Sequence, residues 1–336
     1  MIRKCKVLVT GSQGFVAGYI IKELLSRGYE VVGIDNLIKY GNIVREHDNH
    51  KDFTFYKMDL REDFRKIRDT ILLVDPDYII HCAARLGGIK YFHDFSYDLL
   101  HDNSIIDSNI FSAAVALSGK LVSDNFKRII VLSSSMVYEN TNIYPSTEDS
   151  LKQTLTPSST YGFSKLATEY KCKGAWEQYH VPFTIIRPFN CCGIGEDDFL
   201  EDRESHVIPD LIVKCLQGQD PLHIYGNGNQ IRCYTHGSDI ARGICFAMES
   251  DKAINEDFNI STPISTSVLE LAEKIWNKIN LDKPFRYICD KSFVYDVSKR
   301  VPDISKAKNL LGFEAKISLD ESIDEVITYI KSRINV

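Results

Sequence analysis

The stretch at residues 6–28 restricts the fold more than any other part of the chain. It begins with the apolar run KVLVT at residues 6–10, continues through a turn that contains Gly11 and Gly14, and ends in an amphipathic segment that stops at Gly28. An apolar run, a glycine turn and an amphipathic stretch with a glycine stop are typical of a strand, a tight turn and a helix. The chain is therefore expected to open with a strand–turn–helix unit.

This turn also has a chemical use. Glycine lets the backbone approach a bound pyrophosphate, and the helix that follows presents its free N–H groups to the phosphate charge. A second apolar run at residues 30–35 ends in Asp35, roughly twenty residues beyond the turn, where a carboxylate can bind an adenosine ribose. Because a carboxylate repels a 2′-phosphate, NAD is favoured over NADP, although Arg45 could contact a phosphate if its loop folded back.

Further apolar runs at residues 54–60, 78–84, 128–135 and 183–190 alternate with segments of helical length. Strands that alternate with helices predict an α/β fold of the Rossmann type, a doubly wound parallel sheet with its ligands beyond the carboxyl ends of the strands. After residue 187 prolines become frequent, and the turn at residues 225–229 resembles a hairpin loop. We expect a dinucleotide-binding domain at residues 1–186, joined again by residues 237–262, and a smaller substrate-binding domain at residues 187–336.

Composition limits the possible partners. The chain has 336 residues, of which 44% are hydrophobic, and a net charge of −6, which indicates a globular protein and argues against a nucleic-acid-binding surface. No run approaches the roughly 18 apolar residues of a membrane span, so a cytoplasmic protein with no membrane partner is expected. The nine cysteines lack C-x-x-C spacing, which suits a reducing compartment; no metal site is predicted.

One pair of residues suggests proton chemistry. Tyr161 and Lys165 are four residues apart in a segment that follows a helix start signal at residues 156–159. On a helix the two side chains share a face, and a lysine cation favours the phenolate of a tyrosine whose ordinary pKa is near ~10. Such a pair can move a proton at neutral pH, although the same spacing is common on solvated helices.

Several motifs together resemble a known family. They are Thr10-Gly11-x-x-Gly14-Phe15-Val16-Ala17, Asp35, His81-Cys82-Ala83-Ala84, Ser133-Ser134-Ser135-x-Val137-Tyr138, Tyr161-x-x-x-Lys165 and Arg187-Pro188-Phe189-Asn190. In this order, and over nearly the whole chain, they resemble the extended short-chain dehydrogenases/reductases, the nucleotide-sugar epimerases and dehydratases. The resemblance implies NAD in the first domain, a nucleoside-diphosphate sugar in the second, and a homodimer formed through residues 103–118 and the helix that carries Tyr161.

The resemblance also implies roles for individual residues. Tyr161 takes the proton of a sugar hydroxyl, usually at C4, while the carbon-bound hydride passes to the nicotinamide; Ser134 orients the hydroxyl, and Lys165 lowers the tyrosine pKa and holds the nicotinamide ribose. The implied cofactor contacts are Gly11, Gln13, Gly14, Phe15, Val16, Asp35, Asp59, Leu60, Ala83, Ala84 and Lys165. The implied substrate contacts are Arg85, Gly87, Gly88, Ser135, Met136, Asn190, His206, Val207, Arg232 and Arg300.

Met136 is the informative departure from the family pattern. Its position resembles that of a glutamate in the 4,6-dehydratases and nucleotide-glucuronate decarboxylases, and of a cysteine in the GDP-sugar 3,5-epimerases. A thioether takes no proton at neutral pH, and Ser135 replaces the dehydratase aspartate, so a 4,6-dehydratase is disfavoured. The prediction is hydride transfer at C4, by a 4-dehydrogenase or a 4-epimerase.

Other functions stay open. A 3,5-epimerase would need Cys192 or His206 as its base, and His206 resembles the histidine acid of GDP-fucose synthase. A 4-keto reductase and a non-catalytic cofactor-binding protein are further alternatives. The loop at residues 85–89 resembles the Gly-Gly loop of GDP-mannose 3,5-epimerase and GDP-fucose synthase, which favours a GDP-linked sugar of the mannose or heptose type, as used in surface-polysaccharide synthesis.

Overall fold

A seven-stranded sheet forms the centre of the molecule. The computed structural model describes residues 3–87, 91, 94–119, 123–196, 206–292 and 297–333. The strand order is β11-β6-β5-β4-β1-β2-β3, and every neighbouring pair is parallel. The strands are β1 (Lys6–Thr10), β2 (Glu30–Asp35), β3 (Phe53–Lys57), β4 (Tyr78–His81), β5 (Arg128–Leu132), β6 (Phe183–Pro188) and β11 (Glu256–Ile260). The predicted doubly wound parallel sheet is confirmed.

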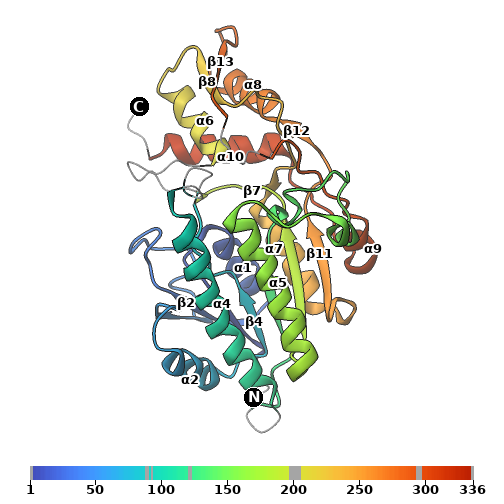
Figure 1. Ribbon diagram of the computed structural model, residues 1–336. Coiled ribbons are helices and arrows are strands. Elements are labelled where there is room, and N and C mark those ends of the chain that lie inside the picture. The colour runs from blue at the N-terminus through green and yellow to red at the C-terminus, as the bar shows by residue number, and fades with distance from the viewer. Residues whose placement is uncertain are drawn as a thin grey trace.

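Helices cover both faces of the sheet (Figure 1). One layer is α1 (Phe15–Ser26) and α7 (Gly237–Glu249), and the other is α2 (Phe64–Val74), α4 (Ser96–Ser118) and α5 (Thr160–Tyr179). Consecutive strand residues face opposite layers, as Val7 and Val9 pack with the first layer and Leu8 with the second. This is why the strands read as continuous apolar runs.

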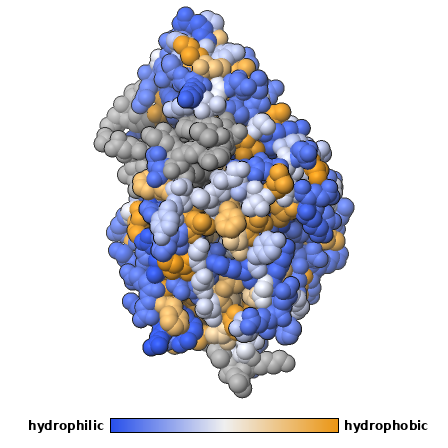
Figure 2. Space-filling model, in the orientation of Figure 1, coloured by the Kyte–Doolittle hydropathy of each residue, from blue (hydrophilic) through white to orange (hydrophobic). Residues whose placement is uncertain are grey.

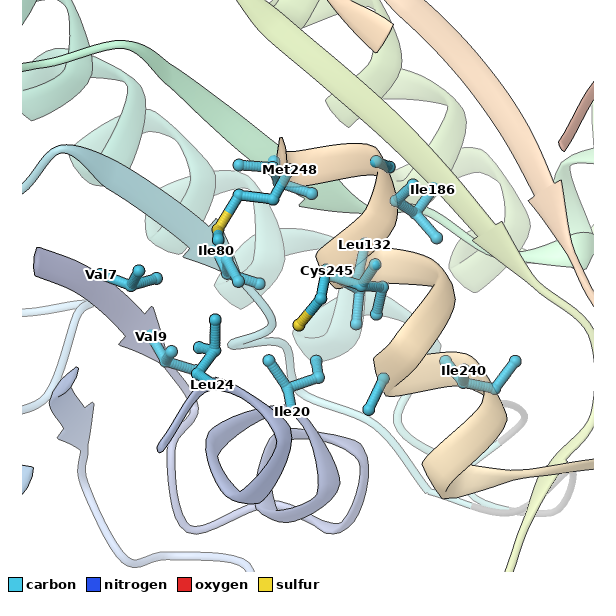
Figure 3. Close-up of a cluster of buried hydrophobic side chains, with 14 of the residues drawn as sticks. Val7, Val9, Ile20, Leu24, Ile80, Leu132, Ile186, Ile240, Cys245 and Met248 are labelled. Carbon is cyan, nitrogen blue, oxygen red and sulfur yellow. The ribbon is translucent and has the colours of Figure 1, made fainter. Parts of the chain in front are cut away.

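The core between the sheet and the first helix layer is shown in Figure 3. Ile20 and Leu24 of α1 and Ile240 of α7 lie against strand residues such as Ile80 and Leu132. Burial of one such side chain stabilises the fold by about 1.5–3 kcal/mol. The helix α7 belongs to this core and β11 to the sheet; the division of the chain into two domains, with residues 237–262 returning to the first, stays a prediction.

A second core lies in the C-terminal part of the chain. It joins α6 (Val207–Leu216), α8 (Val268–Ile279) and α10 (Leu319–Lys331) to β8 (Leu222–Tyr225), and the fully buried Trp276 is its largest side chain. The shorter elements are η1 (Ser135–Tyr138), η2 (Glu148–Gln153), β7 (Cys191–Cys192), β9 (Ile231–Arg232), β10 (Thr235–His236), η3 (Asp251–Ala253), β12 (Thr266–Ser267), β13 (Tyr287–Asp290) and α9 (Ser305–Leu311). Figure 1 places this second core beyond one end of the sheet.

Two expectations about local structure were wrong. The turn at residues 225–229 is not a hairpin, because β8 pairs in parallel with β13 whereas β9 pairs antiparallel with β12. The strands predicted at residues 54–60, 78–84, 128–135 and 183–190 end earlier, at Lys57, His81, Leu132 and Pro188. No helix in the described ranges combines the length and the apolar character that a membrane crossing requires.

Candidate active site

A cleft of about 1380 Å³ opens beyond the carboxyl ends of the central strands. Its lining continues onto α6, β8 and β9 of the proposed substrate domain. Every implied catalytic, cofactor-binding and substrate-binding residue lines this cleft except Gly88, which lies outside the described residues; Cys192, the alternative base, does not line it. The structure therefore brings together side chains from positions 11 to 300 of the chain.

The glycine turn at Gly11 lies directly against the end of β4. Gly11 has φ +67°, and its N–H donates to the Ile34 carbonyl at 2.8 Å. A Cβ atom at this position would lie 2.8 Å from the Ala83 Cα and 2.9 Å from the Ala83 nitrogen. Only glycine combines this left-handed conformation with so close a backbone contact. The turn forms a cradle of the kind that a pyrophosphate needs.

Replacement of Gly11 by alanine is expected to weaken NAD binding by about 10- to 100-fold, because backbone strain of this kind costs roughly 1–3 kcal/mol and the added methyl must push Ala83 away. Isothermal titration with NAD measures the effect. Gly28→Ala is the matched control, since Gly28 has φ +84° but nothing within 4 Å of an added Cβ, so NAD affinity should not change. Equal NAD affinity for Gly11→Ala and wild type would contradict the assignment of the cradle.

Asp35 is fixed at the end of β2 by the same turn. Its two carboxylate oxygens accept the N–H groups of Gln13 at 3.1 Å and of Leu37 at 2.7 Å. Burial raises the pKa of this carboxyl, and the two N–H groups oppose the rise. Each oxygen keeps a lone pair that can accept a ribose hydroxyl. The buried Oε1 of Gln13 has no hydrogen-bond partner among the described residues, so it is open to a ligand.

Arg45 is engaged within the protein. Its guanidinium donates to the Gln13 carbonyl at 3.1 and 2.7 Å and lies over the ring of Tyr40. This arrangement directs the arginine to the backbone of the turn and leaves Asp35 as the acidic residue at the end of β2. The residues present therefore fit the dinucleotide without a 2′-phosphate, as the sequence predicts.

Asp59 is paired with an arginine, Arg61, that the sequence analysis did not identify. Arg61 donates to both oxygens of Asp59, at 3.0 and 2.6 Å, and lowers the pKa of that carboxyl. The same guanidinium reaches Asp102 of α4 at 2.8 Å. Asp59 is thus held in position, as a predicted cofactor contact, by Arg61, which also bonds to Asp102 of α4.

Tyr161 and Lys165 lie on the first turns of α5, as predicted. The Ser159 hydroxyl accepts the N–H of Gly162 at 3.0 Å and caps this helix. Both proposed catalytic side chains are buried, with exposed fractions of 7% and 9%. The Lys165 ammonium donates to the Leu132 carbonyl at 2.9 Å, so α5 is tied to the last residue of β5.

Ser134 follows β5 and faces the same cleft. Its hydroxyl accepts the N–H of Met136 at 3.2 Å and caps η1. The helix α5 can approach η1 closely because position 162 is glycine; a Cβ there would lie 2.8 Å from the Met136 carbonyl oxygen. Close packing of α5 on η1 is thus what brings Tyr161 to the serine segment.

A buried ion pair holds the segment around Ser134 in place. Arg187 of β6 donates to both carboxylate oxygens of Glu169 at 2.8 and 2.7 Å, and their exposed fractions are 1% and 0%. The Ser133 hydroxyl donates to Glu169 at 2.5 Å, and Arg187 also donates to the Tyr138 hydroxyl at 2.7 Å. The residues on both sides of Ser134 are therefore fixed by one charged network.

Arg232 and Arg300, from the C-terminal part of the chain, line the same cleft as Ser134 and Tyr161. The N–H of Arg300 donates to the Ile231 carbonyl at 3.0 Å, which aligns its segment with β9 and Arg232. One guanidinium nitrogen of Arg300 lies 3.5 Å from the Met136 sulfur. Asn190 lines the same cleft, and its Oδ1 atom is buried without a hydrogen-bond partner in the part of the chain that the structure describes. Planar guanidinium groups suit a diphosphate, because each can bind two oxygens.

His206 has a partner that the sequence did not reveal. Its Nδ1 lies 3.2 Å from an oxygen of Glu196, and both residues line the cleft. Cys192 does not line the cleft, and burial raises the pKa of its thiol and of the neighbouring Cys191 thiol. Both cysteines are thus protonated at neutral pH, which argues against Cys192 as a base.

Comparison with known proteins agrees with this geometry. The family model described as the NAD dependent epimerase/dehydratase family matches residues 7–261. A putative UDP-glucose 4-epimerase of Methanocaldococcus jannaschii is 29% identical over 97% of this chain and 98% of its own length. UDP-glucuronic acid decarboxylase 1 of Danio rerio is 27% identical over 96% of this chain and 72% of its own length.

Among solved structures, the chain is similar to the UDP-glucuronic acid 4-epimerase from Bacillus cereus in complex with UDP-glucuronic acid and NAD. The TM-score is 0.83 at 27% identity, over 98% of this chain and 100% of that one. All three names contain a uridine diphosphate sugar, so the preference for GDP that the loop at residues 85–89 suggested finds no support in them. The expectation of NAD is confirmed, because the chain belongs to the NAD dependent epimerase/dehydratase family.

Proposed function

We propose that this protein is a nucleotide-sugar 4-epimerase that uses NAD and acts on a UDP-linked sugar. The observation that carries the proposal is the convergence of Ser134, Tyr161 and Lys165 on the cleft that contains the glycine turn. Ser135 and Met136, which stand beside them, offer no acid or base for a further step. A 4-dehydrogenase, which would release the 4-keto sugar, is the second candidate within the same chemistry.

The side chains suit a proton relay at a sugar hydroxyl. NAD, when bound, accepts a hydride from the sugar carbon and can return it. Tyr161 as phenolate takes the hydroxyl proton, and the Lys165 cation on the same helix face favours that phenolate. Ser134 holds the hydroxyl toward Tyr161. The relay needs neither a thiol nor a second carboxylate, and His206 is proposed as a substrate contact.

Met136 argues against decarboxylation, despite the similarity to a glucuronic acid decarboxylase. At this position the decarboxylases resembled by the sequence have a glutamate, and a buried methionine cannot exchange a proton in its place. The 4-epimerases among the similar proteins share the simpler outcome in which only C4 changes. Epimerisation at C4 therefore fits both the presence of Ser134 and Tyr161 and the lack of an acid or base at Met136.

The nucleotide is proposed to span the two parts of the cleft. Arg232 and Arg300 would bind the diphosphate, with Asn190 between them and the sugar. Uridine is favoured over guanosine because the similar proteins carry it in their names. A role in surface-polysaccharide synthesis and a cytoplasmic location stay predictions.

A homodimer is also proposed, through the outer face of α4 and α5. These helices lie side by side (Figure 1), and aromatic side chains on their outer faces are exposed, with fractions of 74% for Tyr97, 43% for Phe163 and 65% for Tyr170. Figure 2 shows hydrophobic side chains among hydrophilic ones on this side of the molecule. An exposed apolar face of this kind favours association.

The proposed activity is tested with purified protein loaded with NAD. UDP-glucose, UDP-galactose and their N-acetylhexosamine counterparts are incubated separately, and the C4 configuration is followed by proton NMR. Interconversion of one 4-epimer pair without net NADH is the expected result. Formation of one NADH and one 4-keto sugar per substrate consumed would show that the protein is a 4-dehydrogenase. If none of these sugars reacts at C4, the proposed function is wrong.

A further inference from the structure

One buried amide joins the segment that carries Ser134 to the segment that carries Arg300. Asn259 lies on β11, opposite Arg187 of β6, and is fully buried, with an exposed fraction of 0%. It does not line the cleft, yet its side chain bonds to both of the segments that do. Asn259 can therefore affect the reaction only through the residues that it holds.

The oxygen of the amide is bonded to the serine segment. The Tyr138 hydroxyl, at the end of η1, donates to Oδ1 of Asn259 at 3.1 Å and accepts a hydrogen bond from the Arg187 guanidinium at 2.7 Å. Because a guanidinium only donates, the single proton of the Tyr138 hydroxyl goes to the amide oxygen. The amide thereby fixes the end of the short helix that Ser134 caps.

The nitrogen of the amide is bonded to the arginine segment. Nδ2 of Asn259 donates to the carbonyl oxygens of Ser146 and Asp303, at 2.9 and 3.2 Å. Ser146 also forms two backbone hydrogen bonds of 2.8 Å with the chain just after Arg300: its N–H donates to the Val301 carbonyl, and its carbonyl accepts the N–H of Asp303. The amide thus holds the chain that leads directly from Arg300.

The two ends of the amide cannot be exchanged. Both partners of the nitrogen are carbonyl oxygens, which only accept, and the partner of the oxygen is a hydroxyl with a proton to donate. The backbone of residue 259 has a separate bond, from its N–H to the Glu148 carboxylate at 2.7 Å. A change of the side chain therefore removes the link between the two segments and leaves this backbone bond in place.

We propose that Asn259 is a positioning residue that sets the separation between Ser134 and Arg300. The inference rests on the proposed function, in which Arg300 binds the diphosphate and Ser134 holds the sugar hydroxyl. In one nucleotide sugar a single pyranose ring separates these two groups, so both are bound only if the guanidinium and the serine keep matching positions. The two segments meet closely, since a guanidinium nitrogen of Arg300 lies 3.5 Å from the Met136 sulfur of η1.

Asn259→Leu tests the inference in the whole chain, through the affinity for UDP, which titration calorimetry measures without turnover. Leucine is close to asparagine in size, adds no charge and lacks the amide. UDP affinity is expected to fall about tenfold, the value of one charge-assisted hydrogen bond. NAD affinity should stay within about twofold of wild type, because the glycine turn follows β1, which β6, β5 and β4 separate from β11.

Thr184→Val is the matched control. Thr184 lies on β6, is also fully buried and donates from its hydroxyl to the Ala253 carbonyl at 2.6 Å. Valine keeps the shape of the side chain and removes this bond, so the variant loses a buried hydrogen bond to a carbonyl but should keep the UDP affinity of wild type. Equal losses of UDP affinity in Thr184→Val and Asn259→Leu would show that lost stability alone is responsible, and would overturn the inference.

A double variant shows whether Asn259 acts through Arg300. Arg300→Met alone should lower UDP affinity by about 10- to 100-fold, and Asn259→Leu added to it should lower the affinity no further, because the guanidinium that Asn259 positions is already gone. Additive losses would overturn the inference. If circular dichroism shows that Asn259→Leu does not fold, Asn259→Ala removes the same amide with a smaller side chain and is measured in the same cycle.

The same titrations separate this inference from the proposed function. UDP binding with the expected losses but without epimerisation of any sugar would support the role of Asn259 and count against the epimerase. Failure of the wild-type protein to bind UDP would overturn the diphosphate site, and with it both the inference and the proposed function.

Discussion

Replacement of Tyr161 by phenylalanine is expected to lower kcat by about 10²- to 10⁴-fold, the usual contribution of a positioned proton-transfer group. The phenyl ring keeps the apolar packing with Met136 and Val297 and loses only the hydroxyl that takes the sugar proton. Affinity for NAD and for the UDP-sugar should therefore stay within a few-fold of wild type. Stopped-flow or NMR assays give kcat, and titration calorimetry gives the two affinities.

Tyr170→Phe is the matched control for this variant. Tyr170 lies on the same helix but is 65% exposed and outside the cleft, so its hydroxyl has no part in the reaction and kcat should not change. A kcat of Tyr161→Phe within a factor of three of wild type would show that another group moves the proton.

Replacement of Arg187 by methionine is expected to have the largest effect on stability. It would leave the Glu169 carboxylate, which has an exposed fraction of 0%, without the guanidinium that donates to both of its oxygens. Removal of one partner from a buried ion pair costs about 3–5 kcal/mol. Urea unfolding monitored by circular dichroism measures the loss, and kcat should fall as well because Ser133 bonds to the same carboxylate.

A double variant separates charge from packing at this position. Arg187→Met with Glu169→Leu removes the two charges of this pair, and Asp257, which also lies 2.8 Å from Arg187, keeps Lys306 as a partner at 2.7 Å. The double variant should therefore recover part of the stability that Arg187→Met loses. Arg68→Met removes an exposed arginine that pairs with Asp69 and should change stability by less than about 0.5 kcal/mol. If Arg187→Met were as stable as Arg68→Met, the buried pair would have no part in holding the serine segment.

The apolar runs and the glycine turn of the sequence were enough to predict the central parallel sheet. The apolar runs predict strands that are buried on both faces. Gly11 and Asp35 mark the ends of the first two strands, because Gly11 has a left-handed backbone and the Asp35 carboxylate accepts the N–H of Gln13 in the turn that follows Gly11. Strand lengths were overestimated: the strand predicted to reach residue 135 ends at Leu132, and Ser134 lines the cleft instead.

Partners from distant segments could not be predicted. Arg61 and Asp102 are 41 residues apart and meet only because α4 packs on one face of the sheet. The carboxylate of Glu196 meets His206 in the same way, with no local pattern to mark it. The preference for a guanosine nucleotide finds no support among the similar proteins. It was drawn from one loop, whereas the cleft that Arg85 lines also includes Tyr225 and Gln230.

A UDP-hexose that carries deuterium at C4, incubated in ordinary water with protein loaded with NAD, tests the central claim most directly. Hydride removal and return at C4 with Tyr161 as the proton relay predicts a 4-epimer product that retains the deuterium at C4. The same reaction run with unlabelled sugar in heavy water should introduce no deuterium at C3 or C5. Loss of the C4 label to solvent, or deuterium entering C3 or C5, would contradict the account.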